Sequence, residues 1–216
     1  MRIERQIHHY GSGLNALPIL DWFQHNPTDI YLLRVGYGGT SGPLSNIDQS
    51  GFASASFHSW PDTLAWDAYS GDYGPNFSGL IMGSGAYVIT TPNLGTVAFG
   101  GNLIVNSDSS MQVAPRDAVR RMVYLAQYGL RVTVDAGAIE MLTVDPHSKT
   151  MTVSIAEKVT AISREAVASS AILRVEKVIQ VESTGDIVIA TPGLTQDRGG
   201  WKVPLGSSIV NVEISF

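Results

Sequence analysis

The stretch from Asn46 to Phe77 brings acidic and aromatic side chains together in a pattern that suits a sugar-processing site. The flat apolar faces of pyranose rings stack on Trp and Tyr, and glycoside hydrolysis uses two carboxyl groups across the scissile bond. No Lys or Arg lies in this stretch, so no nearby cation favours the ionised form of an acid, which helps keep its pKa high. The members of the group are Asp48, Phe57, His58, Trp60, Asp62, Trp66, Asp67, Tyr69, Asp72 and Tyr73.

The same residues also have ordinary structural roles. An Asp in a Gly-, Ser- and Pro-rich loop commonly caps a turn by accepting hydrogen bonds from its own backbone. His58 is also typical of a structural histidine, and Trp60, followed by Pro61, of a core anchor. No spacing rule supports a metal site built from Asp48, His58 and Asp62, so we expect no metal and no cofactor.

Two short helices are expected before this stretch. Pro18 suits a first helical position. Asn26 suits both the end of that helix and the start of the next, with Asp29 three residues on in a capping-box position. Gly36 is expected to stop the second helix, which leaves residues 36–77 as a long Gly-rich loop. A loop of this length in a compact domain is uncommon unless it is functional.

The second half of the chain predicts an antiparallel β-sandwich. Apolar and polar residues alternate with a period of two, and turn residues separate the runs. Many short strands at this spacing favour two packed sheets. The segment 116–127 fits either a helix or a strand, and we favour the strand. The other expected strands are 86–90, 96–99, 102–105, 130–135, 150–155, 173–176, 187–189 and 210–215.

We therefore expect a mixed α and β fold that is mainly β. Residues 1–85 form the helical hairpin and the long loop, and residues 86–216 form the sandwich. The absence of Cys excludes disulfides, a thiolate nucleophile and Cys-ligated zinc. No apolar run approaches the ~20 residues that span a bilayer. A pI near 5.4 argues against nucleic acid as a partner.

The second half shows no group of residues that predicts a chemical site. Asp108 follows Ser107 and Asp145 precedes Pro146, and both carboxylates therefore predict turns. Arg120 and Arg121 predict a surface feature that forms ion pairs.

Charge is scarce and unevenly distributed. Charged residues make up 15% of the chain, against ~25% in a typical soluble domain. Residues 35–115 hold five Asp and no Lys or Arg, so their net charge of −5 equals that of the whole chain. The deficit therefore belongs to one acidic, aromatic region and not to the whole protein.

Three segments resemble a family of six-hairpin glycosidase-like proteins, which combine an (α/α)6 toroid with β-sandwich domains. They are HNPTDIYLLRVGYGGTSGPLSNIDQSGFASASFHSWPDTLAWDAYSGDYGPNF, GTVAFGGNL and PRDAVRRMVYLAQYGLRVTVDAGAIE. The likeness covers residues 15–140 and extends more loosely to the rest. It implies that residues 1–85 resemble the end of the toroid. Most of the toroid is missing from this chain, so we expect a fragment, or a subunit completed by another chain.

The resemblance implies part of a carbohydrate-active enzyme whose 36–77 loop lines a sugar-binding cleft. The candidate catalytic carboxylates are Asp48, Asp62 and Asp72, and the candidate substrate contacts are His58, Trp60, Trp66 and Tyr73. The alternative is a non-catalytic glycan-binding or structural sandwich subunit. Expected partners are carbohydrate and the chain or segment that carries the remaining helices, with no nucleic acid and no membrane. The sequence does not decide between a cytoplasmic and a secreted location.

Overall fold

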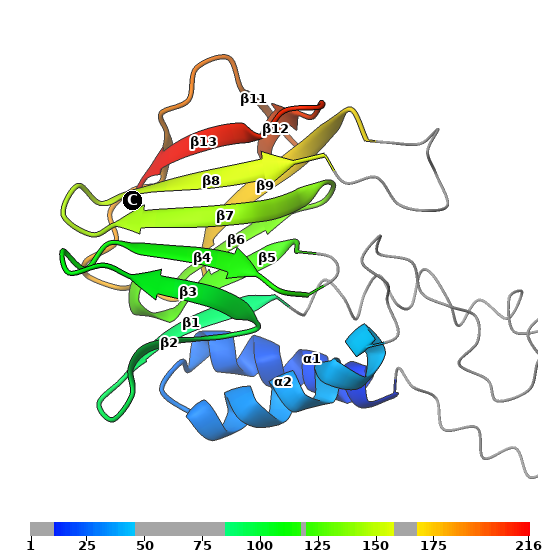
Figure 1. Ribbon diagram of the computed structural model, residues 1–216, viewed down its shortest axis with the longest axis vertical. Coiled ribbons are helices and arrows are strands. Elements are labelled where there is room, and N and C mark those ends of the chain that lie inside the picture. The colour runs from blue at the N-terminus through cyan, green and yellow to red at the C-terminus, as the bar shows by residue number, and fades with distance from the viewer. Residues whose placement is uncertain (1–10, 46–84, 118–119, 158–167) are drawn as a thin grey trace, which may run out of the picture. The chain divides into compact units, whose positions relative to one another are not determined.

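The computed structural model of the chain describes residues 11–45, 85–117, 120–157 and 168–216. The chain divides into two compact units, Met1–Ser84 and Gly85–Phe216. Helices form the described part of the first unit, and strands form most of the second (Figure 1). The expected fold class, mixed and mainly β, is confirmed.

The first unit contains a pair of helices, α1 (Gly11–His25) and α2 (Ile30–Ser45). The Asp29 side chain caps α2, because its Oδ1 accepts a hydrogen bond from the Leu32 amide at 3.1 Å. Asn26 does not have this role. Its Oδ1 accepts a hydrogen bond from the Thr28 hydroxyl at 3.0 Å instead.

Two of the expected helix boundaries are wrong. Pro18 lies inside α1 and not at its first position. Gly36 does not stop α2, which continues to Ser45, so residues 36–45 are helical and not loop. A Cβ at Gly36 would lie 2.8 Å from the Leu20 side chain and 3.2 Å from Ile19. The glycine is therefore needed where α1 and α2 approach each other closely, and not as a helix stop.

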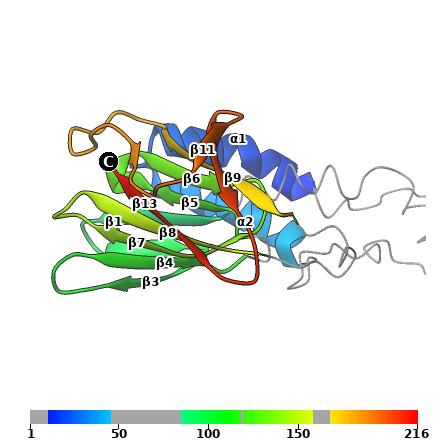
Figure 2. The same ribbon diagram turned by 90° about the horizontal axis from the view of Figure 1, so that it is seen from above.

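The second unit is a sandwich of two sheets, seen as two layers in Figures 1 and 2. The seven-stranded sheet has the order β11-β12-β9-β6-β5-β1-β2, and the six-stranded sheet has the order β10-β13-β8-β7-β4-β3. The bounds of the first seven strands are β1 Ala86–Thr91, β2 Gly95–Phe99, β3 Gly101–Val105, β4 Met111–Pro115, β5 Met122–Leu125, β6 Leu130–Val134 and β7 Ala138–Asp145. Those of the last six are β8 Thr150–Ala156, β9 Ser170–Lys177, β10 Val188–Ile189, β11 Thr195–Asp197, β12 Gly200–Pro204 and β13 Val210–Ser215.

The alternating pattern places one apolar face of each sheet against the other. Every second residue of β6 and β8 is buried, because successive side chains of a strand point to opposite faces. These inward side chains join one core cluster, which includes Val88, Val113, Val123, Leu130, Val132, Leu142, Val153, Leu173, Val203 and Val212. The hydrophobic effect on this shared core therefore holds the two layers together.

The strand predictions agree with the structure where alternation is clean. The ambiguous segment contains β5, as favoured, followed by a 3₁₀ turn at Ala126–Tyr128. The sandwich is not wholly antiparallel, because β1 pairs with β5 in parallel. Strands β4, β7, β11 and β12 were not expected. In β7 a bulge between Ile139 and Met141 interrupts the alternation, which explains why the pattern was not visible.

One edge of the sandwich is closed by a corner. The chain passes from β2 in one sheet to β3 in the other through Gly100, whose φ is 74°. A Cβ at Gly101 would lie 2.9 Å from the Cβ of Ala86, so a side chain would push the two sheets apart there. At the opposite edge of the seven-stranded sheet lies the β11–β12 hairpin, next to β9.

Candidate functional site

The site residues expected from the acidic and aromatic stretch lie outside the described residues. This applies to Asp48, His58, Trp60, Asp62, Trp66, Asp72 and Tyr73. Their roles remain predictions.

The two carboxylates predicted to form turns do so. Asp108 Oδ1 accepts hydrogen bonds from the Ser110 hydroxyl at 2.7 Å and the Ser110 amide at 2.9 Å, and these lower the pKa of Asp108. Asp145 accepts hydrogen bonds from the Ser148 hydroxyl at 2.8 Å and the His147 amide at 2.8 Å, which lower the pKa of Asp145. Both bond sets stabilise the ionised form.

The paired arginines differ from each other. Arg120 forms the expected ion pair, with its Nη1 2.7 Å from Glu140 Oε2. Arg121 is largely withdrawn from water, and this desolvation lowers its pKa, while the charge of Asp135 opposes the shift. Its Nε is buried and has no hydrogen-bond partner among the described residues. The expectation of a surface ion pair therefore holds for Arg120 only.

The β11–β12 hairpin is where the structure gathers polar and aromatic side chains of the second half, for which the sequence predicted no chemical site. Its two-residue turn consists of Arg198 and Gly199, with φ of 47° and 73°. Positive φ at both central positions is the geometry of a type I′ turn, which matches the twist of a hairpin. The register pairs Asp197 with Gly200 and Gln196 with Trp201. Charged, amide and aromatic side chains are thus collected within one short hairpin.

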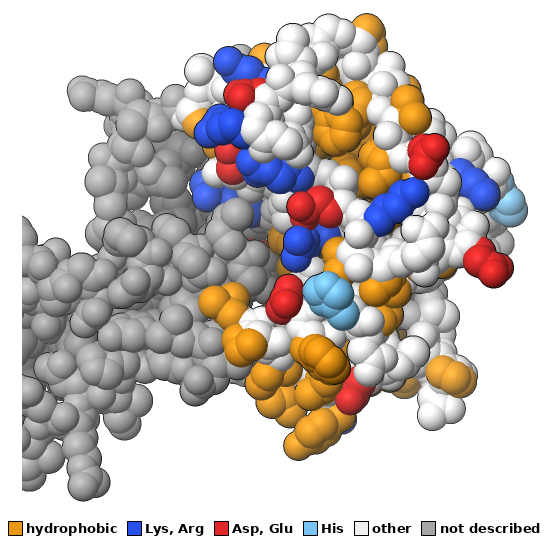
Figure 3. Space-filling model, turned by 180° about the vertical axis from the view of Figure 1, so that it is seen from behind, with side chains coloured by type: hydrophobic (Ala, Val, Ile, Leu, Met, Phe, Trp, Pro, Cys, Tyr) orange, Lys and Arg blue, Asp and Glu red, His pale blue; other side chains and the backbone are white. Residues whose placement is uncertain are grey.

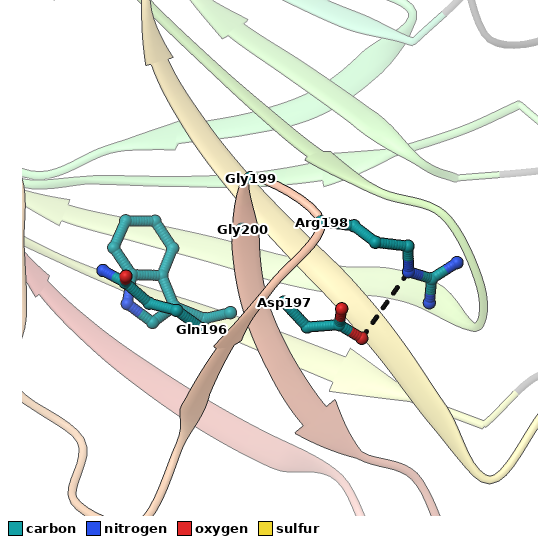
Figure 4. A pocket seen from close by; sticks show the side chains of 6 residues that line it. Gln196, Asp197, Arg198, Gly199 and Gly200 are labelled. Atoms are coloured by element: carbon teal, nitrogen blue, oxygen red, sulfur yellow. Dashed lines mark ion pairs between the residues drawn. The ribbon is translucent and has the colours of Figure 1, made fainter.

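An open pocket of about 360 Å³ is lined by this hairpin, from Gln196 to Trp201. Gln196 and Trp201 face each other across the strands, so their side chains lie on the same side of the hairpin. Asp197 and Arg198 extend on the other side from Gln196 (Figure 4). Gly199 and Gly200 have no side chains to close the space between the two sides.

The position of Trp201 follows from its neighbour in β9. Trp201 pairs with Leu173, and Val203 pairs with Ala171; both partners and Val203 belong to the core. The indole therefore continues the inward-facing row of side chains to the edge of the sheet, where it is only partly buried.

Close approach to β9 fixes the hairpin. A Cβ at Gly200 would lie 2.5 Å from the Leu173 carbonyl oxygen and 2.9 Å from Cγ of Arg174. Only a residue without a side chain fits there. The Arg174 side chain lies against Gly200 instead. Its Nη2 donates a hydrogen bond to the Arg198 carbonyl oxygen at 3.1 Å.

Two carboxylates lie near the guanidinium of Arg198. Asp197 Oδ2 is 3.5 Å from its Nε, and Asp135 Oδ2 is 3.9 Å from its Nη2. Asp135 is held in place by its Oδ1, which accepts a hydrogen bond from the Ile172 amide at 2.7 Å. The hairpin is therefore tied electrostatically to the end of β6 as well as to β9.

The sequence did contain a signal for this site. Asp-Arg-Gly-Gly is a turn sequence, and Trp201 after it is the one Trp outside the first half. The pairing with β9 cannot be read from these residues, so their relation to Arg174 was missed.

Within the described ranges, no group of three or more His, Asp or Glu residues is arranged to hold a metal ion. The helices in those ranges are also too short or too polar to cross a membrane.

The fold and the site define a two-layer β-sandwich protein with an open pocket at an edge hairpin. The chain belongs to the family DUF5695, a family of unknown function, which matches residues 1–212. No curated protein and no solved structure gives a match.

Proposed function

We propose that the sandwich binds carbohydrate at the β11–β12 hairpin, as the binding domain of a carbohydrate-active protein. The observation that carries the proposal is the pairing of Trp201 with Gln196 beside one open pocket. An indole offers a flat apolar surface for the C–H face of a sugar ring. The Gln196 amide both donates and accepts hydrogen bonds, which suits sugar hydroxyls.

The shape of the pocket supports a chain of sugars more than a small enclosed ligand. Gly199 and Gly200 leave the middle of the lining free of side chains. A ligand that stacks on Trp201 can therefore continue past the turn toward Asp197 and Arg198, where charged groups are available for further hydrogen bonds.

Binding is favoured over hydrolysis at this pocket because its described lining contains one carboxylate, Asp197. Hydrolysis of a glycosidic bond uses two carboxyl groups. Asp197 is also paired with Arg198, which favours the role of a hydrogen-bond acceptor.

Catalysis in the wider protein remains a second proposal, carried by the resemblance to six-hairpin glycosidases. In it, the 36–77 loop lines the sugar-binding cleft, Asp48, Asp62 or Asp72 supplies a catalytic carboxylate, and the sandwich is a supporting domain. Alanine variants of the three, assayed in the assembled protein on a glycan that it binds, test this. Full activity in all three variants would contradict it.

We also propose that the exposed apolar side chains of α1 and α2 bind further helices. Trp22 is 64% exposed and Tyr31 is 74% exposed, and Val35 lies one turn after Tyr31 on the same face of α2. Helices of an incomplete toroid would present such side chains to the neighbouring helices. Association of the chain with a protein that carries those helices, measured by light scattering, would support this, and no loss of association in Tyr31→Ser would contradict it.

The test of glycan binding uses the full chain on a glycan array, followed by calorimetry with the best oligosaccharide. We expect Trp201→Ala to weaken binding about 30-fold, because a buried aromatic contact is worth ~2 kcal/mol or more. Trp201→Phe should retain most of the affinity, since a flat ring remains. Trp22→Ala is the matched control and should bind as the wild type does. Equal affinity of Trp201→Ala and the wild type, or no binding to any glycan, would refute the proposal.

A further inference from the structure

The outer face of β6, β9 and β12 carries an unusual share of the cations in this acidic chain. Arg131, Arg174 and Lys202 lie on it, and Arg198 follows in the adjacent turn. Figure 3, which looks from behind, shows Lys and Arg side chains gathered on one part of the molecule with Asp and Glu among them. The chain as a whole has a net charge of −5.

These cations differ in how well they are paired. Arg131 is satisfied by Glu176, which accepts from its Nε at 2.9 Å and lies 2.9 Å from its Nη2. The nearest carboxylate oxygens to Arg198 are 3.5 and 3.9 Å away, which is longer than a charge-assisted hydrogen bond of ~2.8 Å. Arg198 is also 66% exposed.

Arg174 and Lys202 have no carboxylate within 4.0 Å in the part of the chain that the structure describes. The described bond of the Arg174 guanidinium goes to a neutral acceptor, the Arg198 carbonyl. Most of the N–H groups of Arg174 are therefore available to bind an anion.

The sheet register brings the incompletely paired cations to the hairpin. Lys202 pairs with Ile172, and Arg174 is two residues further along β9, opposite Gly200. Arg174 and Lys202 thus lie on the outer face of β9 and β12, on the side opposite to Trp201, and Arg174 bonds directly to the turn at Arg198. The carboxylates within 4.0 Å of this group in the described residues are Asp135 and Asp197, both beside Arg198, so two carboxylates accompany three cations.

We propose that the glycan bound at this hairpin is acidic, with uronic acid units whose carboxylates are held by Arg174, Arg198 and Lys202. This inference rests on the proposed glycan-binding function. Guanidinium groups bind planar carboxylates through paired N–H···O bonds. In an oligouronate, one ring can stack on Trp201 while the carboxylates of units that continue past the turn reach the cations on the other side of β12. Sulfated sugars offer an anion of different geometry, and the experiment separates the two sources.

The experiment titrates the full chain with three probes in calorimetry: oligogalacturonate, its methyl ester, and a sulfated oligosaccharide of similar length. The methyl ester keeps the rings and removes the charge. We expect oligogalacturonate to bind about tenfold more tightly than the ester, and to lose this advantage as salt is raised, because salt screens exposed charges. We expect the sulfated probe to bind more weakly than oligogalacturonate, because its anionic groups are not planar carboxylates.

Variants identify the cations that hold the ligand. Arg174→Gln and Lys202→Gln should each weaken oligogalacturonate binding about three- to tenfold and leave the weak binding of the ester unchanged. Arg131→Gln is the matched control, since it removes the same charge from the same sheet face but from an arginine already paired with Glu176. It should leave the affinity within twofold of the wild type.

Three results would overturn the inference. The first is equal affinity for oligogalacturonate and its ester while Trp201→Ala still weakens both, which would leave the glycan-binding proposal intact. The second is stronger binding of the sulfated probe than of oligogalacturonate. The third is an effect of Arg131→Gln as large as that of Arg174→Gln, which would indicate long-range attraction and not a binding site.

Discussion

The outer faces of the two sheets differ in chemistry, although both sheets bury the same kind of inner face. Across the six-stranded sheet, Gln112, Thr143, Thr152 and Glu213 lie side by side on β4, β7, β8 and β13. This row consists of hydroxyl and amide groups with one carboxylate.

The corresponding row of the seven-stranded sheet is aromatic and charged. Tyr87, Tyr124, Arg131 and Glu176 lie side by side on β1, β5, β6 and β9. Tyr87 and Tyr124 are fully buried, with ring centroids 6.1 Å apart. The inner faces give the fold its stability, whereas the pocket and the cations of the proposed glycan site lie on and beside the seven-stranded sheet.

The largest expected effect is on the free energy of unfolding, and it distinguishes an inward-facing from an outward-facing residue of β7. Leu142 in β7 is fully buried, while its neighbour Thr143 points the other way. We expect Leu142→Ala to lower the free energy of unfolding by about 2–5 kcal/mol, because it removes buried apolar atoms and leaves a cavity. Thr143→Ala should cost less than about 1 kcal/mol. Urea unfolding followed by circular dichroism measures both, and equal losses would show that the faces are not distinct energetically.

The next effect concerns the hairpin that distinguishes the seven-stranded sheet. Gly200→Ala places a Cβ 2.5 Å from the Leu173 carbonyl oxygen, so β12 must move away from β9. We expect a loss of about 1–3 kcal/mol in stability, together with weaker glycan binding. Gly199→Ala meets no atom within 4 Å, although its φ of 73° is unfavourable for Ala, and should cost about 1 kcal/mol.

Binding and unfolding measured on both glycine variants distinguish the clash from the backbone effect. If Gly199→Ala weakened binding as much as Gly200→Ala, the close contact with β9 would not be what positions the pocket.

At alkaline pH, we expect ionisation of Tyr124 in the seven-stranded sheet to lower the stability of the fold. Burial raises the pKa of Tyr124 to about 12, whereas an unfolded Tyr titrates near ~10. The stability that comes from this difference is present below pH ~10 and is lost as the pH rises toward 12, because the unfolded chain ionises first. Tyr124→Phe should therefore lose less stability than the wild type between pH 9 and 11, a range set by these pKa values.

Thermal unfolding over that pH range, with absorbance at the tyrosinate band, tests this expectation. Identical pH profiles for the two proteins would show that Tyr124 ionises equally easily in the folded and unfolded chain.

The smallest effect is expected at the acidic end, in the turns of the six-stranded sheet. Hydrogen bonds from the Ser148 hydroxyl and the His147 amide lower the pKa of Asp145. The resulting stability is present above the ordinary Asp value of ~3.9 and is lost as the pH falls through the lower folded value. Asp145→Asn should unfold at a lower temperature than the wild type at pH 7. At pH ~2, where the carboxylate is protonated, the difference should shrink, and a difference that stays constant with pH would contradict this origin.

Several strands could be predicted because local alternation alone determines which residues turn inward. The runs that became β6, β8 and β13 show this most clearly. The bulge in β7 interrupts its alternation, and β11 is only three residues long, so a period of two cannot be recognised in either. The prediction that Gly36 ends a helix was wrong, because sequence alone does not distinguish a glycine that ends a helix from one that allows two helices to pack closely.

The candidate site was predictable only in part. Asp108 and Asp145 were correctly assigned to turns, since a turn carboxylate bonds to its own neighbourhood in the sequence. The cation cluster involves Arg174 on β9 and Lys202 on β12, which meet only because these strands pair. The proposed catalytic and substrate contacts between Asp48 and Tyr73 lie outside the described residues and remain to be tested.

The sequence by itself determined that the second half is built from strands with one apolar face, because side chains in an extended chain alternate between two sides. It also determined the polar turns, whose hydrogen bonds are local. Only the tertiary structure decided which strands share a sheet, the parallel pairing of β1 with β5, and the placement of Arg174 beside the Arg198 turn. Those arrangements depend on contacts between segments far apart in the chain, and any apolar strand face can pack against several others until the whole core is assembled.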